Sequence, residues 1–347
     1  MCGGGAEHVI AILSDEMCKR GYDVSILLTS DDIIDYELNE NVKVVQISER
    51  TGGGLSGRLK RISAIRRYYK AHRDAAYIGM ETSTNIFALI AGTGLDMNIT
   101  VSERIDPGKY SSQGLMKRAY ETLGRKFIFQ TGAQRDYFCK KIRDRSVIIP
   151  NPIDPEVLKL TDSISSTQKD REKVILSVGR LNEQKDYPVL LEAFRQFCLT
   201  RDDYELKIYG KGEDEEALKE LTVKLGIDDK VRFMGFSRNI WENEYNDRMF
   251  VMSSHYEGMP NALIEAMTMG LPCISTDCPI GGPAELINND SNGLLVPIKD
   301  PSALCKAMLK IANDDDLCNR LSLEAIKIKK RLSLSVICDE WIEKLLG

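Results

Sequence analysis

The chain has 347 residues, of which 43% are hydrophobic and 29% charged, and its formal net charge is -5. This length suits two domains of ordinary size, each with its own core. The nine cysteines show no C-x-x-C spacing and the three histidines lie far apart, so we expect a reduced, cytosolic protein without a structural zinc site. No apolar run approaches the length of a membrane span, and no secretory signal is visible.

Short apolar strands alternate with helical stretches along the whole chain. In the first half we expect strands near residues 24–28, 42–47, 75–80, 98–102, 127–129 and 146–149. In the second half we expect them near residues 174–178, 205–209, 231–233, 249–252, 273–275 and 293–296. Strands that alternate with helices form parallel sheets, so the sequence predicts an α/β protein.

Positive charge is concentrated in residues 51–150, where 18 Lys and Arg against 8 Asp and Glu give +10, which leaves -15 for the rest of the chain. Basic residues there surround apolar ones at nearly helical spacing: Arg58, Lys60, Arg61, Arg66, Arg67, Lys70 and Arg73 around Leu59, Ile62, Ile65 and Tyr69. A basic amphipathic helix can lie on an anionic membrane. A core-packed helix with a solvated basic face gives the same pattern. Nucleic acid is a weaker option, because the aromatic residues are not interleaved as stacking platforms.

Pro150 and Pro152 disfavour helix and mark a domain boundary. We therefore expect a first domain over residues 1–150 and a second over residues 151–332. Residues 333–347, which include Trp341, have the pattern of an amphipathic helix.

The most informative segment is residues 254–267, in which Glu257 and Glu265 bracket a Gly-Met-Pro-Asn turn. Pro260 suits the first helical position, so we expect a helix to start there. Its N-terminus would face a glycine loop at the carboxyl end of a strand, where a diphosphate can bind. Carboxylates accept hydrogen bonds from hydroxyls, so the two glutamates fit the sugars of a nucleotide sugar. The alternative is a pair of solvated surface glutamates, since short motifs give many false matches.

Several blocks, in this order along the chain, resemble the family four retaining glycosyltransferases of the GT-B fold. They are Gly-Gly-Gly-Ala-Glu at 3–7, Ile-Pro-Asn-Pro-Ile-Asp at 149–154, Ile-Leu-Ser-Val-Gly-Arg-Leu at 175–181, Gln-Lys-Asp at 184–186, Ile-Tyr-Gly-Lys-Gly at 208–212, the Glu-x7-Glu segment within 252–277, Cys-Pro-Ile-Gly-Gly-Pro at 278–283 and Asn-Gly-Leu-Leu-Val-Pro at 292–297. The resemblance covers nearly the whole chain and is strongest over residues 174–297.

The resemblance implies two Rossmann-like parallel-sheet domains that face a cleft, with the helix of residues 333–347 crossing back to the first domain. Relatives begin with a strand that leads into the glycine loop, whereas this sequence starts at Met1-Cys2-Gly3. We therefore expect the first domain to lack its first strand and to expose unpaired strand edges.

In relatives, an arginine and a lysine that correspond to Arg180 and Lys185 stabilise the leaving diphosphate, as fixed cations do. With these charges and the helix N-terminus in place, no metal is needed. By the same resemblance Glu257 contacts the donor sugar and Glu265 the ribose. The residues implied at the donor are Gly4, Gly5, Gly179, Gly210, Gly258, Met259, Pro260, Asn261, Ala262 and Glu265. The acidic run of residues 314–316 is expected to be solvated surface.

The block Ser-Glu-Arg-Ile-Asp-Pro at 102–107 follows a predicted strand and resembles a block of polysaccharide-forming members of the family. The resemblance assigns Glu103 and Arg104 to the acceptor. A capped turn with an internal ion pair is the alternative.

The expected function is transfer of a hexosyl unit, with retention, from a nucleotide diphosphate sugar to a saccharide or lipid-linked acceptor in surface polysaccharide synthesis. UDP is favoured by its frequency in the family, and no cofactor is expected besides this co-substrate. The protein would be cytoplasmic and peripheral at the inner membrane face. Two alternatives remain: a GT-B-fold nucleotide-sugar epimerase, for which the histidines are poorly placed, and a non-catalytic nucleotide-sugar-binding subunit.

Overall fold

The structure is a computed structural model that describes residues 5–29, 37–47, 54–163 and 171–346. The chain divides into a first unit, Met1–Pro152 with Leu332–Gly347, and a second unit, Ile153–Arg331. All strand pairs in the described residues are parallel. Each of the predicted strands is present, with ends that differ by at most two residues.

The first unit contains a four-stranded sheet in the order β3-β4-β5-β6 and a separate two-stranded sheet, β1-β2. Its strands are β1 (Ser25–Leu28), β2 (Lys43–Gln46), β3 (Ala76–Gly79), β4 (Asn98–Ser102), β5 (Lys126–Phe129) and β6 (Ser146–Ile148). Its helices are α1 (Gly5–Lys19), α2 (Leu55–Ala71), α3 (Thr82–Gly92), the 3-10 helix Pro107–Lys109, α4 (Gln113–Leu123), α5 (Gly132–Asp136), α6 (Lys140–Arg143) and α16 (Leu334–Leu346). Within the described residues, no ladder joins the two sheets.

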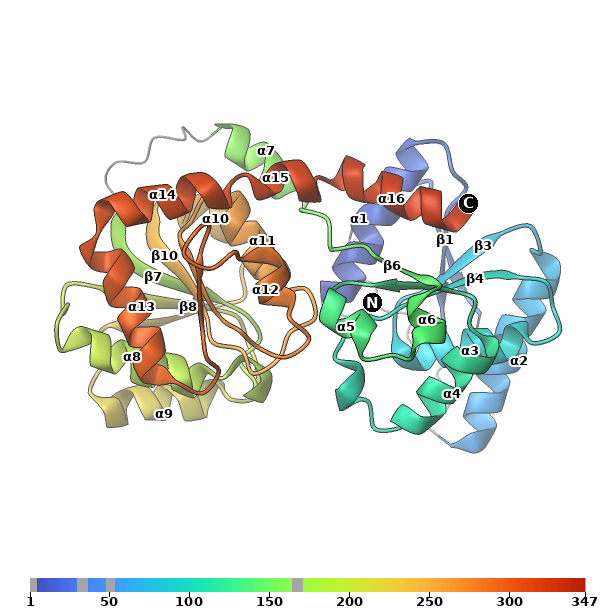
Figure 1. Ribbon diagram of the computed structural model, residues 1–347, viewed down its shortest axis with the longest axis horizontal. Coiled ribbons are helices and arrows are strands. Elements are labelled where there is room, and N and C mark those ends of the chain that lie inside the picture. Colours follow the sequence, from blue (N-terminus) through green and yellow to red (C-terminus); the bar gives the residue numbers. More distant parts are fainter. Residues whose placement is uncertain (1–4, 30–36, 48–53, 164–170, 347) are drawn as a thin grey trace. The chain divides into compact units, whose positions relative to one another are not determined.

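Helix α16 joins the first unit although it comes from the end of the chain. It packs beside α1, as Figure 1 shows in red and blue. Arg20, the residue after α1, donates to Asp339, and the Asn98 side chain donates to the carbonyl of Leu345 over 2.7 Å. Trp341 is fully buried. The apolar face predicted for this helix is therefore buried.

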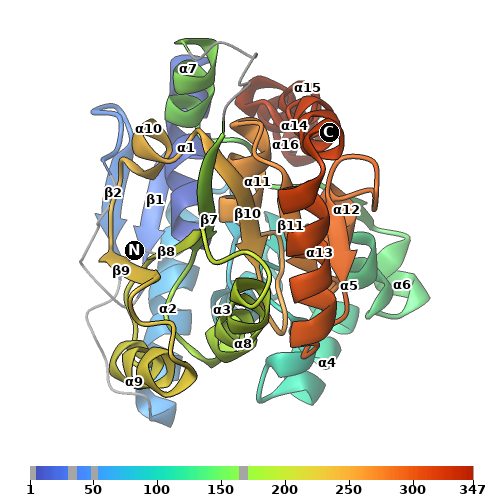
Figure 2. The ribbon, with the colours of Figure 1, turned by 90° about the vertical axis from the view of Figure 1, so that its left-hand side faces the viewer.

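The second unit is built on one six-stranded sheet in the order β12-β11-β10-β7-β8-β9. Its strands are β7 (Glu172–Val178), β8 (Glu205–Tyr209), β9 (Val231–Gly235), β10 (Asp247–Met252), β11 (Cys273–Thr276) and β12 (Leu294–Val296). Its helices are α7 (Pro155–Ser163), the 3-10 helix Glu183–Lys185, α8 (Tyr187–Cys198), α9 (Glu215–Leu225), α10 (Ile240–Asn243), α11 (Asn261–Thr268), α12 (Gly282–Leu286), α13 (Pro301–Asn313), α14 (Asp315–Ala325) and α15 (Ile328–Leu332). Helices α8 and α13 lie side by side (Figure 1, Figure 2) and share one core with the sheet. Strand β10 is buried at every position, as expected for a central parallel strand.

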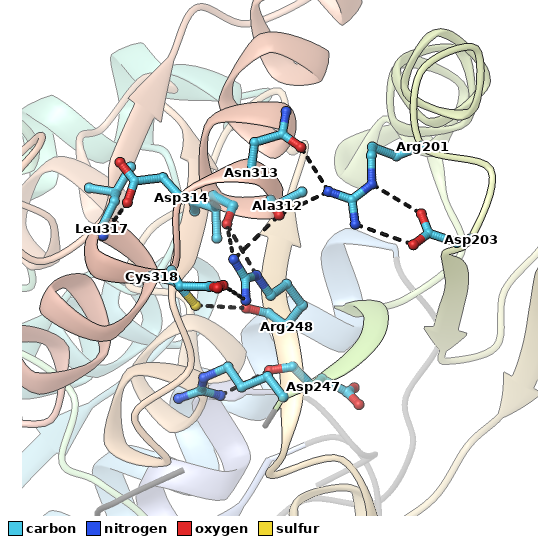
Figure 3. A network of polar contacts seen from close by, with 12 residues as sticks. Arg201, Asp203, Asp247, Arg248, Ala312, Asn313, Asp314, Leu317 and Cys318 are labelled. Carbon is cyan, nitrogen blue, oxygen red and sulfur yellow. Dashed lines mark hydrogen bonds and ion pairs between the residues drawn. The ribbon is translucent and has the colours of Figure 1, made fainter. Parts of the chain in front are cut away.

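The acidic run at residues 314–316 caps and anchors a helix junction (Figure 3). Asp314 accepts from the amide of Leu317 over 2.8 Å and so caps α14. Arg248 pairs with Asp315 over 2.6 Å and donates to the carbonyl of Ile311 at the end of α13. These residues are exposed, as predicted, but two of them also fix the start of α14.

Candidate active site

The strand order of the second unit changes direction at β7. Strand β7 pairs with β8 on one side and with β10 on the other. The sheet continues from β8 to β9 in one direction and from β10 through β11 to β12 in the opposite direction, so the strand order reverses between β7 and β10. Ligands of open parallel sheets bind at the carboxyl ends of the strands at such a point. The loops that follow β7 and β10 carry Lys185 and Glu257.

Lys185 and Glu257 contact each other directly. The ammonium of Lys185 lies 2.5 Å from Oε1 of Glu257, and their side chains are 17% and 8% exposed. The same carboxylate oxygen accepts from the hydroxyl of Ser254 over 2.7 Å, and Oε2 accepts from Gln184 over 3.4 Å. The structure thus joins two predicted catalytic residues that are far apart in sequence.

Backbone contacts hold these two loops together. The amide of His255 donates to the carbonyl of Gln184 over 2.8 Å, and the hydroxyl of Ser253 donates to the carbonyl of Lys185 over 2.8 Å. Thr276, at the end of β11, donates to the carbonyl of Ser254 over 2.6 Å. The Lys185–Glu257 contact therefore rests on a fixed frame.

Arg180 is exposed at the carboxyl end of β7. The glycines beside it allow close backbone approach: Gly210, with φ of 144°, would place a Cβ 1.9 Å from the carbonyl oxygen of Gly179. Any side chain at Gly210 would collide with that loop. Gly179 and Gly210 thus bring the ends of β7 and β8 together next to Arg180.

The helix after Glu257 begins one residue later than predicted. Pro260 has ψ of 109° and is the N-cap, so α11 runs over Asn261–Thr268. A proline has no N–H, and at a helix start no hydrogen bond is lost by this. Pro260 is therefore compatible with the first helical position as well as with the N-cap, and the prediction chose the former. Asn261 and Ala262 lie in the first turn, at the positive end of the helix dipole. Met259 precedes them and is 7% exposed.

A glycine outside the predicted set supports the turn before α11. A Cβ on Gly282, at the start of α12, would lie 1.6 Å from the carbonyl oxygen of Gly258. This close approach falls within the Cys-Pro-Ile-Gly-Gly-Pro block of the sequence. The block is therefore a packing partner of the glutamate turn.

Glu265 lies on α11, just over one turn from the helix start. Its Oε2 accepts from the indole Nε1 of Trp241 over 2.9 Å. Sequence reasoning missed Trp241, because nothing local links it to a glutamate 24 residues away.

The predicted glycines of the first unit are only partly covered. Gly4 lies outside the described residues, and Gly5 is the exposed first residue of α1.

Glu103 and Arg104 are buried within the first unit, at the carboxyl end of β4. Glu103 accepts from Thr82 over 2.8 Å and also from Tyr120, and burial raises the pKa of its carboxyl. Arg104 donates to Asn151 over 2.8 Å and lies 5.3 Å from the ring centre of Trp341. Burial lowers its pKa to about 9.

The alternative for this block, a capped turn, is present: Asp106 accepts from the amide of Gly108 over 2.7 Å. The contacts of Glu103 and Arg104 fix strand ends and α16, so their direct contact with an acceptor stays a prediction. Among the described residues, no three His, Cys, Asp or Glu side chains form a metal-ligand set.

Comparison with known proteins decides what the second unit is. Residues 160–328 match the family of glycosyl transferases group 1. The second unit is a group 1 glycosyltransferase domain. A glycosyltransferase of Haemophilus influenzae is 24% identical over 97% of this chain and 95% of its own length. A Campylobacter jejuni N-acetylgalactosaminyltransferase is 26% identical over 98% and 94%.

Solved structures show that this glycosyltransferase has the GT-B fold. Anabaena HepE in complex with UDP and glucose superposes with a TM-score of 0.81 at 17% identity, over 99% of this chain and 96% of that one. The apo form of the lipopolysaccharide outer core galactosyltransferase WaaB gives 0.77 at 18% identity over the same shares. The family and the fold predicted from the sequence are confirmed.

Proposed function

We propose that this glycosyltransferase moves a hexosyl unit from a UDP-sugar to a saccharide or lipid-linked acceptor, with retention and without a metal ion. The observation that carries the proposal is the meeting of Lys185, Glu257 and the start of α11 at the carboxyl ends of β7 and β10. Cations and helix amides gathered at one place suit a leaving diphosphate.

Each element of the site has a role in this reaction. An ammonium has three N–H donors, so Lys185 can hold Glu257 and a diphosphate oxygen together. Arg180, exposed at the end of β7, supplies a second cation. As the bond from C1 to the diphosphate breaks, the acceptor oxygen bonds to C1 on the same face and its proton passes to a leaving oxygen. Glu257 contacts hydroxyls of the donor sugar and Glu265 those of the ribose.

The names of relatives support the substrate classes. HepE was crystallised with UDP and glucose, and the Campylobacter jejuni relative is named for a PP-undecaprenol-linked acceptor. An amylovoran biosynthesis glycosyltransferase of Erwinia amylovora is 25% identical over 83% of this chain. We therefore place the activity in surface polysaccharide or lipid-linked oligosaccharide synthesis.

A transfer assay tests the proposal. The protein is incubated with radiolabelled UDP- and GDP-sugars and with bacterial membrane lipids, with and without EDTA. We expect transfer from one UDP-sugar, unchanged by EDTA, and an NMR coupling in the product that matches the donor's anomer. Free conversion of the donor would instead indicate an epimerase, and saturable binding without turnover a binding subunit. Loss of turnover with EDTA would contradict metal independence.

We also propose that the enzyme works at the inner face of the plasma membrane. None of the helices described in the structure is both long and apolar enough to cross a bilayer. Helix α2, however, exposes Leu55 and Leu59 beside Arg58 and Lys60. Apolar and basic side chains on one helix suit an anionic membrane surface.

A further inference from the structure

The carboxylate of Glu265 accepts a hydrogen bond from a neighbouring side chain that has no part in the proposed transfer reaction. The indole Nε1 of Trp241 donates to Oε2 of Glu265 over 2.9 Å. Trp241 is 6% exposed, whereas Glu265 is partly exposed on α11. The indole N–H that donates this hydrogen bond therefore lies inside the second unit, and the carboxylate that accepts it lies nearer the surface.

Trp241 is fixed in place before any ligand arrives. Its ring packs on Phe250 of β10, with ring centres 6.4 Å apart, and Phe250 is fully buried. Two planar groups packed this way leave the indole little freedom to turn. The position of its N–H is thus set by the core of the second unit.

The short helix that carries Trp241 is anchored as well. Glu244 ends α10 and is 3% exposed. Its carboxylate accepts from the hydroxyl of Tyr209 over 2.6 Å and from Lys207 over 2.7 Å, both on β8. A buried carboxylate with two such partners is costly to move. Strand β8 therefore sets the place of α10 and, through it, of the indole.

The chemistry of this contact bears on hydroxyl recognition. An indole N–H only donates, and a carboxylate has about four acceptor positions on its two oxygens. The bond from Trp241 to Oε2 restricts the rotation of the Glu265 side chain, and a carboxylate can accept from two adjacent hydroxyls as well. A side chain that is oriented beforehand loses less conformational entropy when it binds.

We propose that Trp241 is a positioning residue that orients Glu265 toward the ribose hydroxyls, so that the donor site selects ribonucleoside diphosphates. This inference rests on the ribose role of Glu265 given under the proposed function. The inference adds Trp241 as the residue through which Glu265 favours nucleotides that carry both ribose hydroxyls.

Nucleotide affinities measured by titration calorimetry test the inference. UDP and GDP are compared with their 2′,3′-dideoxy forms, on the wild type, Trp241→Phe and Glu265→Gln. Phenylalanine keeps most of the ring and loses the N–H. We expect Trp241→Phe to weaken binding of the ribonucleotide about three- to tenfold, the range that loss of one typical hydrogen bond gives. The affinity for the dideoxy form and kcat at saturating donor should stay within about twofold.

Trp341→Phe is the matched control, because this buried tryptophan belongs to the first unit. It should leave all the nucleotide affinities unchanged. If Trp241→Phe kept the wild-type preference for the ribonucleotide, or weakened both forms equally, the positioning role would be wrong. If Glu265→Gln also kept that preference, or the wild type bound neither diphosphate, the proposed function would fail and the inference with it.

Discussion

Lys185 and Glu257 form a contact that couples folding to the proposed chemistry. Their charged atoms lie 2.5 Å apart and both side chains are mostly buried. Loss of one partner of such a pair leaves the other charge uncompensated, which costs on the order of 3 kcal/mol. We expect Lys185→Met and Glu257→Gln to lower the thermal midpoint of the second unit. The double variant should recover much of the loss, because it leaves no lone charge.

Activity should not follow stability in this series. Removal of a group that stabilises transition-state charge lowers kcat about 10²- to 10³-fold, so the single and double variants should all be impaired. The more exposed pair Arg195–Glu192, with side chains 37% and 33% exposed, serves as the control. The same replacements there should cost less than about 1 kcal/mol and leave kcat intact. A double variant at Lys185 and Glu257 that regained activity would show that the pair serves folding alone.

At the residue scale, the sequence was a better guide to which side chains lie at the candidate site than to the contacts that these side chains make with one another. Glu257 and Lys185 were predicted as separate contacts to the donor, yet they bond to each other, because the loops after β7 and β10 are neighbours only in the folded sheet. The partner of Glu265, Trp241, had no local sequence pattern at all. Contacts between distant segments depend on strand order, which one sequence does not specify.

At the scale of elements, the start of β10 contains a buried acid whose ionisation opposes folding. Asp247 is 1% exposed, and burial together with the carboxylate of Glu244 raises its pKa to about 8. In the unfolded chain its pKa is close to 4. The folded state therefore binds one more proton than the unfolded state between about pH 4 and pH 8.

The sign of this difference predicts a pH profile. The contribution of Asp247 to stability is full below about pH 4 and falls as the pH rises through 8, by at most about 1.4 kcal/mol per pH unit. Asp247→Asn cannot ionise, so its melting temperature should lie above that of the wild type at pH 8, and the two should converge toward pH 5. Parallel profiles for the two proteins would contradict this.

Asp203, drawn beside Arg201 in Figure 3, is the control. Its bonds to Arg201 hold the pKa of that carboxyl well below its usual range. Replacement by asparagine should therefore leave the slope between pH 5 and pH 8 unchanged.

The elements themselves were predictable because their patterns are local. Each strand is a short apolar run, and the parallel sheets follow from the alternation of strands with helices. The start of α11 was placed one residue early, because Pro260 is compatible with both the cap and the first helical position. A cap is distinguished by its ψ angle, which composition does not reveal.

At the scale of the whole molecule, the two units differ in whether they are formed by one continuous segment of the chain. The second unit is continuous in sequence, whereas the first recruits α16 from the end of the chain. Trp341 and Ile337 of α16 are fully buried there. The amphipathic pattern of residues 333–347 was visible in the sequence. That this helix packs on the first unit was predicted only from the resemblance to relatives, because an apolar helix face does not indicate which surface it packs against.

Helix α2 is the part of the first unit best suited to meet a membrane. Leu55 is 75% exposed and Leu59 58%, while Ile65 and Tyr69 are buried in the core. The helix therefore has a packed half toward its end and an exposed half, both apolar and basic, at its start. We expect the protein to sediment with vesicles that contain phosphatidylglycerol and much less with phosphatidylcholine alone, because basic residues contribute about 1 kcal/mol each near an anionic surface.

The exposed leucines should contribute as much as the charges. Burial of a leucine side chain is worth about 1.5–3 kcal/mol, so the Leu55→Ser, Leu59→Ser double variant should bind anionic vesicles at least about tenfold more weakly. Leu199→Ser is the matched control, since Leu199 is 78% exposed in the second unit, at the end of α8. It should bind like the wild type. Equal losses in both variants would mean that exposed apolar surface anywhere drives the binding, and α2 would then have no special role.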